Sequence, residues 1–341
     1  MSKVCVIITT INHPTEAILK YQSVKEIDIV IVCDIKTPLE KYNTLNCILL
    51  TLEKQEELYP SLYKILPFNH YCRKNFGYIY AIQNKYDIII DTDDDNIPYD
   101  IFFDNIKSNF IHYEKKLVSN TKYLNIYKLF SNQHIWPRGF PLNEINKSTN
   151  HIIENYDKND IGIIQSMVDG DPDVDSIYRL TTNNDQKNFK FNKNVNMYIL
   201  NHKTYCPANT QNTYWLKSDI FYLLYIPSYI NFRFCDILKM YIAQRLLQKD
   251  KLKLSFIEST VFQERNFHNL MNDFNDEIGM FNNTEKLIEI LNDISLDNSL
   301  DDINENKYDI FVNIYKSLIE NKIIKNSEEI NIINEFIYLI K

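Results

Sequence analysis

Glycine, arginine and tryptophan are scarce in this chain of 341 residues. It has five glycines and two tryptophans, and only six of its 37 basic residues are arginine. Because average glycine usage is about 7%, the remaining glycines are expected where no other residue fits the backbone. The remaining arginines are expected where a rigid, bidentate guanidinium is needed and lysine cannot replace it. The accompanying excess of asparagine, isoleucine, lysine and tyrosine is typical of an AT-rich genome, such as that of a large DNA virus or a protist.

Features that would indicate a membrane, nucleic-acid or zinc protein are missing from the sequence. No apolar run approaches the ~18 residues of a membrane span, and residues 4–8 are too few and too β-branched for a signal peptide. A net charge of −8 argues against nucleic acid or an anionic membrane as a partner. The six cysteines have no metal-type spacing, so we expect buried free thiols in a reducing compartment and a cytoplasmic location.

The first hundred residues predict an α/β fold. Strand-like runs at 4–11, 27–33, 47–52 and 86–90 alternate with helical segments that begin near 14, 55 and 74. Thr15 is positioned to begin the first of these helices, over Ile18 and Tyr21. Such alternation is typical of a mainly parallel sheet with helices on both faces.

The remainder of the chain has a mixed pattern followed by helices. Further strands are predicted at 161–167 and 196–200, and a strong helix at 235–248. Beyond about residue 280 the pattern is helical, with Thr284 as the expected N-cap of a helix and further helices at 308–320 and 328–340. We interpret this tail as a helical appendage without a catalytic constellation.

The most informative segment is 86–96, in which a short apolar run leads directly into Asp91, Asp93, Asp94 and Asp95. Closely spaced carboxylates repel one another, and a divalent cation with oxygen ligands is the simplest way to neutralise them. The carboxyl end of a buried strand is also where open α/β sheets bind ligands. The alternative is a solvated acidic turn.

Two other acidic motifs can be excluded for this segment. An EF-hand loop requires glycine and glutamate where the chain has Asn96 and Phe102. A phosphatase of the haloacid type would have threonine or valine at Asp95. The remaining interpretation is the Asp-x-Asp motif of nucleotide-sugar glycosyltransferases at residues 93–95, which by itself is a weak signal.

The scarce residues gather in segments near this motif. Arg73, Asn75 and Gly77 open a predicted helix, where a helix N-terminus and a guanidinium form a natural anion site. Trp136, Arg138 and Gly139 lie in a Pro/Gly turn that could stack on a sugar and grip hydroxyls or phosphate. An ordinary helix start and a packing corner are the respective alternatives.

Three later segments add polar side chains. Residues 169–175 carry alternating carboxylates, of which Asp169 and Asp171 could hold hydroxyls, whereas for Asp173 we favour a solvated turn. Residues 209–215 combine the amides of Asn209, Gln211 and Asn212 with a tryptophan, as in a carbohydrate groove. Asp236 is predicted at the start of a helix, and residues 263–269 follow a probable strand.

Six short sequence motifs, in this order along the chain, carry a resemblance to a known family: Thr92–Asn96, Trp136–Pro141, Asp169–Asp175, Asp236–Ile237, Ala243–Leu247 and Arg265–Asn269. The segment from about 4 to 280 resembles the STELLO-type glycosyltransferase-like proteins and, more distantly, the reversibly glycosylated polypeptides, which are UDP-arabinopyranose mutases. STELLO proteins have a membrane anchor and reside in the Golgi, whereas this sequence contains no such span, so their location and partners are not transferred.

The resemblance implies a GT-A fold and nucleotide-sugar chemistry. The GT-A-like domain would cover residues 1–280, with a nucleotide-binding half at about 1–100 and an acceptor half at 101–280, and residues 281–341 would form the helical extension. The implied reaction transfers a sugar from a nucleoside-diphosphate sugar, with a UDP-sugar as the expected donor, to a hydroxyl of a carbohydrate or glycoprotein acceptor.

Site residues follow from this reaction. The donor would be held by Thr9, Thr10, Asn12, Asp34, Arg73, Asn75, Asp93, Asp94 and Arg265. A Mn²⁺ or Mg²⁺ ion would be bound by Asp93 and Asp95, with His268 as a further ligand, because many GT-A enzymes have a histidine near the C-terminal end of the core. The substrate would contact Trp136, Arg138, Gly139, Asp169, Asp171, Asn209, Gln211 and Asn212. Asp236 would act as the general base, or alternatively would only cap its helix.

Two other functions stay open at this point. Arg138 resembles in position the self-glycosylated arginine of the plant family, which would make the protein a UDP-sugar mutase. A non-catalytic module that binds nucleotide-sugars or scaffolds other transferases is the second alternative. The sequence leaves the sugar, the acceptor, the stereochemistry and the oligomeric state open.

Overall fold

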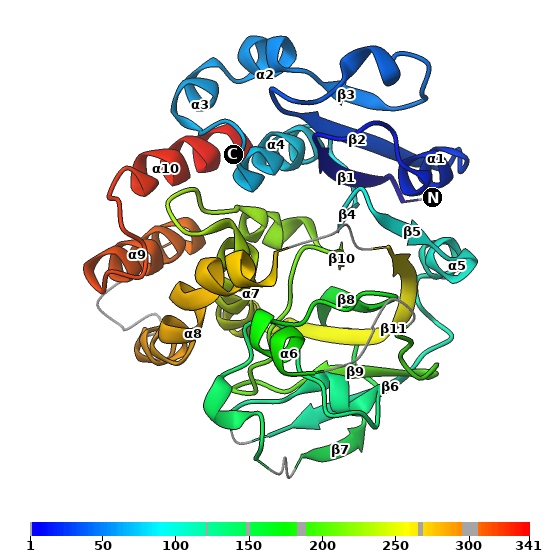
Figure 1. Ribbon diagram of the computed structural model, residues 1–341, viewed down its shortest axis with the longest axis vertical. Coiled ribbons are helices and arrows are strands. Elements are labelled where there is room, and N and C mark those ends of the chain that lie inside the picture. The colour runs from blue at the N-terminus through cyan, green and yellow to red at the C-terminus, as the bar shows by residue number, and fades with distance from the viewer. Residues whose placement is uncertain (1, 121, 148–150, 183–188, 265–268, 295–305) are drawn as a thin grey trace.

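One mixed sheet runs through the part of the chain that the computed structural model describes, which comprises residues 2–120, 122–147, 151–182, 189–264, 269–294 and 306–341 (Figure 1). Its eleven strands are β1 (Val4–Thr10), β2 (Ile27–Cys33), β3 (Ile48–Leu50), β4 (Ile88–Thr92), β5 (Asn96–Pro98), β6 (Glu114–Ser119), β7 (Ile152–Asn155), β8 (Ile161–Asp169), β9 (Asn196–Leu200), β10 (Asn212–Trp215) and β11 (Lys253–Gln263). Their order is β3-β2-β1-β4-β10-β8-β11-β9-β6-β7, and β5 pairs with β11.

The first four strands form an all-parallel unit. β1 lies between β2 and β4, and β3 pairs with the outer side of β2. Their β-branched side chains are buried on both faces of the sheet, as expected for parallel strands between helices. β10 then runs antiparallel to both β4 and β8, whereas β11 is parallel to β8. The α/β class with a mixed, mainly parallel sheet is therefore confirmed.

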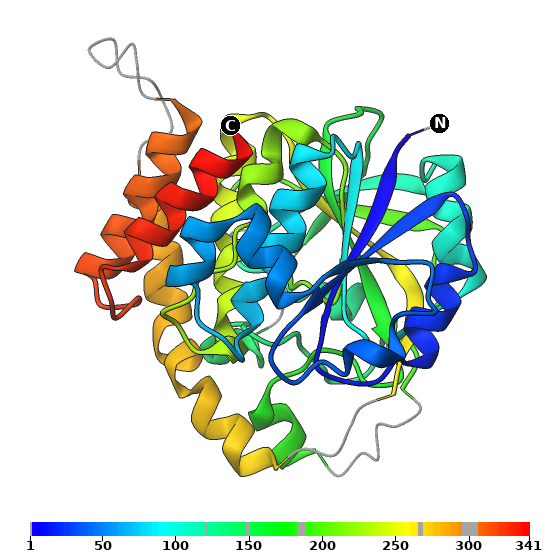
Figure 2. The ribbon, with the colours of Figure 1, turned by 90° about the horizontal axis from the view of Figure 1, so that it is seen from above.

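Helices cover both faces of this parallel unit, as Figure 2 shows. The α-helices in the described residues are α1 (Glu16–Gln22), α2 (Leu52–Leu58), α3 (Pro60–Ile65), α4 (Asn75–Gln83), α5 (Asp100–Ser108), α6 (Ser176–Thr181), α7 (Phe232–Lys249), α8 (Leu270–Asp293), α9 (Lys307–Glu320) and α10 (Glu329–Ile340). α2, α3, α4 and α10 lie on one face, and α1 and α5 lie on the other (Figure 2). None of the helices in the described ranges is both long and apolar enough to span a membrane.

The close packing of α4 on the sheet explains one of the few glycines. A Cβ atom on Gly77 would lie 2.6 Å from Ile7 and 2.7 Å from Val32, which is too close for any larger residue. This contact holds α4 against β1 and β2, and the short 3₁₀ helix η2 (Tyr71–Lys74) before it also packs on β1. Gly77 thus occupies a position where only glycine fits, as predicted.

The element boundaries differ from the predictions in three places. The single helix expected to begin near residue 55 is divided into α2 and α3, because Pro60 lacks the N–H that a continuous helix needs. The predicted cap at Thr284 is wrong, since α8 begins after Asn269 and the Thr284 hydroxyl donates to the Met280 carbonyl within it (2.9 Å). α7 begins at Phe232, earlier than predicted, with Asn231 as its cap.

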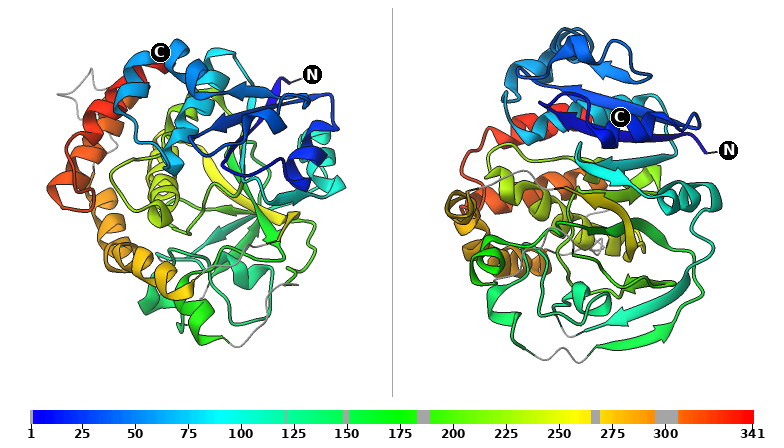
Figure 3. Two further views of the ribbon diagram at one scale, coloured as in Figure 1. Left: turned by 45° about the horizontal axis from the view of Figure 1, so that its top comes forward. Right: turned by 45° about the vertical axis from the view of Figure 1, so that its right-hand side comes forward.

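The C-terminal helices follow one side of the molecule and reach the N-terminal half. Figure 3 shows α8, α9 and α10 in succession along this side. α8 packs against α6 and α7, and α10 packs against α3 and α4. The helices predicted at 308–320 and 328–340 are confirmed as α9 and α10. The C-terminal helices therefore contact both halves of the sheet domain: α8 packs on the second half and α10 on the first.

Candidate functional site

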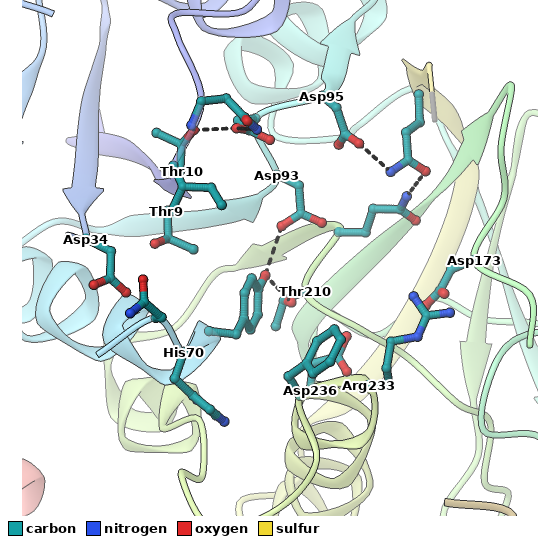
Figure 4. A pocket seen from close by; sticks show the side chains of 18 of the residues that line it. Thr9, Thr10, Asp34, His70, Asp93, Asp95, Asp173, Thr210, Arg233 and Asp236 are labelled. Atoms are coloured by element: carbon teal, nitrogen blue, oxygen red, sulfur yellow. Dashed lines mark hydrogen bonds between the residues drawn. The ribbon is translucent and has the colours of Figure 1, made fainter. Parts of the chain in front are cut away.

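A cleft of about 550 Å³ opens where β1, β2 and β4 end (Figure 4). Thr10 ends β1, Asp34 follows β2 and Asp93 follows β4, so the parallel strands deliver all three side chains to one edge. The predicted residues that line the cleft are Thr9, Thr10, Asn12, Asp34, Asp93, Asp94, Asp95, Arg138, Asp171, Gln211 and Asp236. The sequence thus predicted the location of the cleft from strand ends.

One side of the cleft, which we call the acidic wall, consists of Asp34, Asp93, Asp94 and Asp95. Asp94 joins the loop after β4 to the loop after β1, because its carboxylate accepts hydrogen bonds from the Thr10 hydroxyl and from Asn12 Nδ2, the latter at 3.0 Å. Its backbone carbonyl accepts a further bond from the Thr15 hydroxyl. Asp94 therefore fixes the shape of this wall.

Asp93 and Asp95 point into the cleft (Figure 4). Asp93 Oδ1 accepts a hydrogen bond from the Tyr71 hydroxyl at 2.9 Å, and Asp95 Oδ2 accepts one from Gln263 Nε2 at 2.9 Å. Burial raises the pKa of Asp93 to about 7, with Lys74 opposing the shift and Asp95 adding to it. Burial also raises the pKa of Asp95 to about 6, against the Gln263 hydrogen bond and with the help of Asp94.

These two carboxylates have the features of a cation site. Asp95 Oδ1 is buried and has no hydrogen-bond partner among the described residues, although a buried carboxylate oxygen is costly to leave unpaired. Oxygen ligands of this kind suit Mg²⁺ or Mn²⁺, and Mg²⁺ is commonly held by one or two carboxylates together with phosphate oxygens and water. No group of three or more His, Cys, Asp or Glu side chains that could hold a metal occurs in the described ranges. The predicted third ligand, His268, lies outside those ranges, as does Arg265.

The fourth carboxylate of the acidic run is neutralised by the protein. Lys74 Nζ lies 2.6 Å from Asp91 Oδ1 and Lys239 Nζ lies 3.0 Å from Asp91 Oδ2, and all three side chains are buried. Lys74 also donates to the Thr92 carbonyl at 2.7 Å and lies 3.7 Å from Asp93. The repulsion inferred from the sequence is therefore relieved at Asp91 by two lysines, while Asp93 and Asp95 have weaker compensation.

The opposite side of the cleft, the ion-paired wall, is centred on Arg138. Its guanidinium lies between Asp173 (2.7 Å) and Asp236 (2.9 Å) and also donates to the Arg233 carbonyl. Burial alone would raise the pKa of Asp173, but Arg138 and Asn209 hold it below its usual value. Burial alone would lower the pKa of Arg138, but Asp173 and Asp236 raise it. The five N–H groups of Arg138 are all directed to acceptors in this network.

Two sequence interpretations are corrected by this wall. Asp173 is not in a solvated turn, because its side chain is 15% exposed and forms the ion pair with Arg138. Asp236 does not cap its helix, since the Asn231 side chain accepts the hydrogen bond from the Arg233 N–H at 2.8 Å. The sequence could not reveal either fact, because the residues that meet here are far apart along the chain.

Two further arginines complete the ion-paired wall. Arg179 lies 2.6 Å from Asp171, and Arg233 lies 2.6 Å from Glu277 on α8. Glu277 in turn accepts hydrogen bonds from the N–H and hydroxyl of Ser176 at the start of α6. α6, α7 and α8 are thus tied together directly behind the cleft.

Several predicted site residues do not line the cleft. Arg73 is fully buried, bonds to Gln55 and lies over the rings of Phe68 and Phe76, so the predicted grip on a diphosphate is not supported. Asn75 is buried as well, and its amide bonds to the backbone of Ile226.

Trp136 and Gly139 also have packing roles. Trp136 is buried with its Nε1 donating to Asp175 at 2.6 Å, so its ring is not available for stacking on a sugar. Gly139 adopts φ +85°, and a Cβ there would lie 2.5 Å from Ile237. The packing corner, which was the alternative interpretation of this segment, describes both residues.

The remaining three predicted residues lie behind the cleft. Asp169 is buried and accepts hydrogen bonds from the Phe191 N–H and the Tyr99 hydroxyl. Asn212 bonds to Thr260 at 2.8 Å. Asn209 bonds to Asp173 and Gln165 and so supports the ion-paired wall without lining the main cleft.

Other cleft residues were not predicted. They include Lys36, His70, Tyr71, Thr210, Phe232, Arg233 and Gln263. Burial lowers the pKa of His70, whose Nδ1 accepts the Cys72 N–H at 3.1 Å. His70 and Tyr71 lie three and two residues before Arg73, so the segment of the predicted anion-site motif borders the cleft although Arg73 itself does not line it.

The fold and the cleft define an α/β protein with an acidic cleft at the carboxyl ends of its parallel strands. The family model described as STELLO glycosyltransferases matches residues 233–341, which include α7 to α10. "Probable glycosyltransferase STELLO2" of Arabidopsis thaliana is 28% identical over 259 residues, which are 71% of this chain and 33% of the relative. "Probable glycosyltransferase STELLO1" of the same plant is 27% identical over 259 residues, with the same coverage.

The chain is therefore similar to the STELLO-type glycosyltransferases, and the resemblance predicted from its motifs is confirmed. It spans about a third of the length of these curated relatives. A solved mycobacterial protein has 8% identity and a TM-score of 0.40 over 85% of this chain and 73% of its own.

Proposed function

We propose that the protein is a glycosyltransferase of GT-A type that transfers a sugar from a nucleoside-diphosphate sugar, with a UDP-sugar as the expected donor, to a hydroxyl group. The observation that carries this proposal is the pairing, across one cleft, of two cation-suited carboxylates, Asp93 and Asp95, with a third carboxylate, Asp236. The similarity to relatives named as probable glycosyltransferases supports the same activity.

The acidic wall suits the donor. Asp34, Thr10 and Asn12 lie at the ends of β1 and β2, where base and ribose can be bound by hydrogen bonds. A divalent ion bound by Asp93 and Asp95 would offset the negative charge of the departing diphosphate, an effect worth several kcal/mol. Without such an ion the carboxylates of this wall would repel the diphosphate.

Asp236 remains the proposed general base. Arg138 contacts both of its oxygens, but an ionised carboxylate has about four lone-pair sites and can still accept a hydrogen bond from an acceptor hydroxyl. Arg138 then keeps the carboxylate oriented toward the cleft. Because general-base catalysis contributes roughly 10²–10⁴-fold, Asp236→Asn should lower turnover by at least tenfold while donor binding persists. A smaller loss would contradict the assignment.

The mutase alternative is disfavoured by the surroundings of Arg138. A self-glycosylated arginine must act as a nucleophile, which requires a neutral, accessible nitrogen. The N–H groups of Arg138 instead donate to Asp173 and Asp236. Burial alone would lower the pKa of Arg138, but these two carboxylates raise it above its usual value, so the guanidinium stays charged. Incubation with a UDP-sugar alone separates the two functions, since a mutase forms an isomeric UDP-sugar and a transferase slowly releases UDP.

A thermal-shift screen of nucleotides and nucleotide-sugars, with and without Mn²⁺, tests the proposal most directly. We expect UDP compounds to raise the melting temperature only when Mn²⁺ or Mg²⁺ is present. No shift with any UDP or GDP compound would contradict the proposed function. Turnover is then measured as UDP release over a panel of carbohydrate acceptors.

A further inference from the structure

A short loop connects the C-terminal helices with the cleft. Residues 225–231, which we call the connecting loop, follow the 3₁₀ helix η6 (Ser218–Leu224) and lead directly into α7. The first turns of α7 carry the cleft residues Phe232, Arg233 and Asp236. The position of this loop therefore sets where the ion-paired wall stands relative to the acidic wall.

Glu329, the first residue of α10, holds this loop from the side away from the cleft. It is fully buried, and its carboxylate accepts hydrogen bonds from the Tyr225 hydroxyl, from the Ser228 N–H (3.0 Å) and from the Tyr229 N–H (2.8 Å). A carboxylate buried at this depth is costly unless it is bonded in this way, and an apolar residue would serve packing alone better. Glu329 thus fixes the backbone of two loop residues and the side chain of a third.

The cleft side of the loop is held by Asn75, the first residue of α4, and lies near the segment before α4. The amide of Asn75 forms two hydrogen bonds, each of 2.8 Å, with the N–H and the carbonyl of Ile226. Burial lowers the pKa of His70, which lines the cleft, and the nearby Ile230 backbone opposes that shift. The neighbouring Tyr71 contacts Asp93. The connecting loop is therefore clamped between α10 and the segment that supports the acidic wall.

We propose that Glu329 is a positioning residue for the reaction and that α10 is part of the functional site. By holding the connecting loop, Glu329 keeps Arg233 and Asp236 at a fixed separation from Asp93 and Asp95. The inference rests on the proposed glycosyltransferase function. The family match over residues 233–341 contains both α7 and α10, in agreement with a shared role. It replaces the interpretation of the tail as an appendage without a part in the site.

Glu329→Gln in the full chain is the test, with Glu328→Gln as the matched control. Glu328 is the N-cap residue directly before Glu329, but it is exposed, and its side chain bonds only to Asn331 among the described residues. In Glu329→Gln, an amide N–H₂, which is a donor, replaces one of the carboxylate oxygens that accept the backbone N–H groups of the loop, so at least one of these hydrogen bonds is lost. Because a displacement of about 1 Å can cost 10²-fold in rate, we expect turnover at saturating UDP-sugar to fall by about ten- to a hundredfold. UDP affinity should change less than about threefold, and Glu328→Gln should match the wild type.

Turnover is expressed per molecule that binds UDP with Mn²⁺, so that partly unfolded protein does not count. Hydrogen exchange of peptides covering 225–231 is measured in parallel, and we expect it to be at least about tenfold faster in Glu329→Gln, with no change in β6. A variant that merely loses stability would keep wild-type turnover per binding molecule. Unchanged loop exchange, or faster exchange without a fall in turnover, would overturn the proposal.

A second variant covers the case in which Glu329→Gln does not fold. Tyr225→Phe removes one donor to Glu329 and leaves the carboxylate and the ring in place, so a smaller effect in the same direction is expected, about threefold in turnover. If the wild-type chain binds no nucleotide, the proposed function fails, and loop exchange alone then decides whether Glu329 is the clamp. The two failures are thus distinguishable.

Discussion

The two walls of the cleft contain similar numbers of carboxylates but treat them differently. In the ion-paired wall, Asp171, Asp173 and Asp236 are each bonded to an arginine, and the network is closed within the protein. In the acidic wall, Asp93 and Asp95 have raised pKa values, chiefly because of burial, and one oxygen of Asp95 has no hydrogen-bond partner in the described part of the chain. A wall that is complete provides a rigid frame, whereas a wall with uncompensated charge provides the driving force for binding a cation.

The largest expected effect comes from opening the ion-paired wall. Arg138→Met would leave Asp173 and Asp236 buried without a cation, and breaking a buried pair in this way typically costs about 3–5 kcal/mol. Urea unfolding measures the loss. Arg245→Met is the control, since the bonds of Arg245 go to Gln248 and a backbone carbonyl. A loss for Arg138→Met no larger than for Arg245→Met would mean that the network is not essential to the frame.

The acidic wall should respond in the opposite way. Asp93→Asn and Asp95→Asn relieve repulsion, so we expect the metal-free variants to unfold at the same urea concentration as the wild type or a higher one. In the presence of Mn²⁺–UDP, treated as one ligand at 100 times its Kd, the unfolding free energy of the wild type should rise by about 2.7 kcal/mol. Both variants should lose that gain. Removal of the metal with EDTA should return the wild type to its metal-free stability. A wild-type gain that survives in both variants would place the cation elsewhere.

The sequence predicted the acidic wall better than the ion-paired wall. Asp93 and Asp34 follow continuous apolar runs, and such runs end at one edge of a parallel sheet, so their meeting place follows from local pattern alone. β2 was predicted with the observed bounds for the same reason. Arg138, Asp173 and Asp236 come from a turn, a loop and a helix, and no periodicity links them.

Buried lysines were the other unpredictable feature. Lys239 neutralises Asp91 from 148 residues away, and a lysine on a helix is usually solvated, so composition gives no sign of this contact. The scarcity of glycine and arginine was informative in part. Gly77 and Gly139 are each required by close packing, but Arg73 is a buried structural residue and not a ligand contact. Scarcity therefore indicates that a residue is constrained, without indicating whether packing or binding constrains it.

Asp175, which lies behind the ion-paired wall, differs from the carboxylates of that wall because no arginine is bonded to it among the described contacts. Burial raises the pKa of Asp175 to about 6, even though the Tyr178 N–H and Trp136 Nε1 bond to it. The folded state therefore favours the protonated acid: its contribution to stability is complete below about pH 4 and is lost as the pH rises through 6. Between pH 4 and pH 7 this group should cost the wild type about 2 kcal/mol.

Asp175→Asn should remove that part of the pH dependence. We expect the difference in unfolding free energy between variant and wild type to shift in favour of the variant by about 2 kcal/mol from pH 4 to pH 7. Urea unfolding at a series of pH values measures this difference, and a constant offset from the altered hydrogen bond to Trp136 does not affect it. Parallel curves for the two proteins would show that Asp175 is ionised in the native state across this range.

The smallest effect is expected at Asp94, which separates charge from hydrogen bonding within the acidic wall. Both the Thr10 hydroxyl and Asn12 Nδ2 donate to the same oxygen of Asp94, so an asparagine can present its carbonyl oxygen to them. Asp94→Asn should therefore stay within about 0.5 kcal/mol of the wild type, whereas Asp94→Ala should lose about 1–2 kcal/mol as its donors lose their acceptor. Loss of the Mn²⁺ response in Asp94→Asn would instead assign Asp94 to the cation site with Asp93 and Asp95. A retained response would mean that two of the three consecutive carboxylates act through their charge and that Asp94, between them, acts through its geometry.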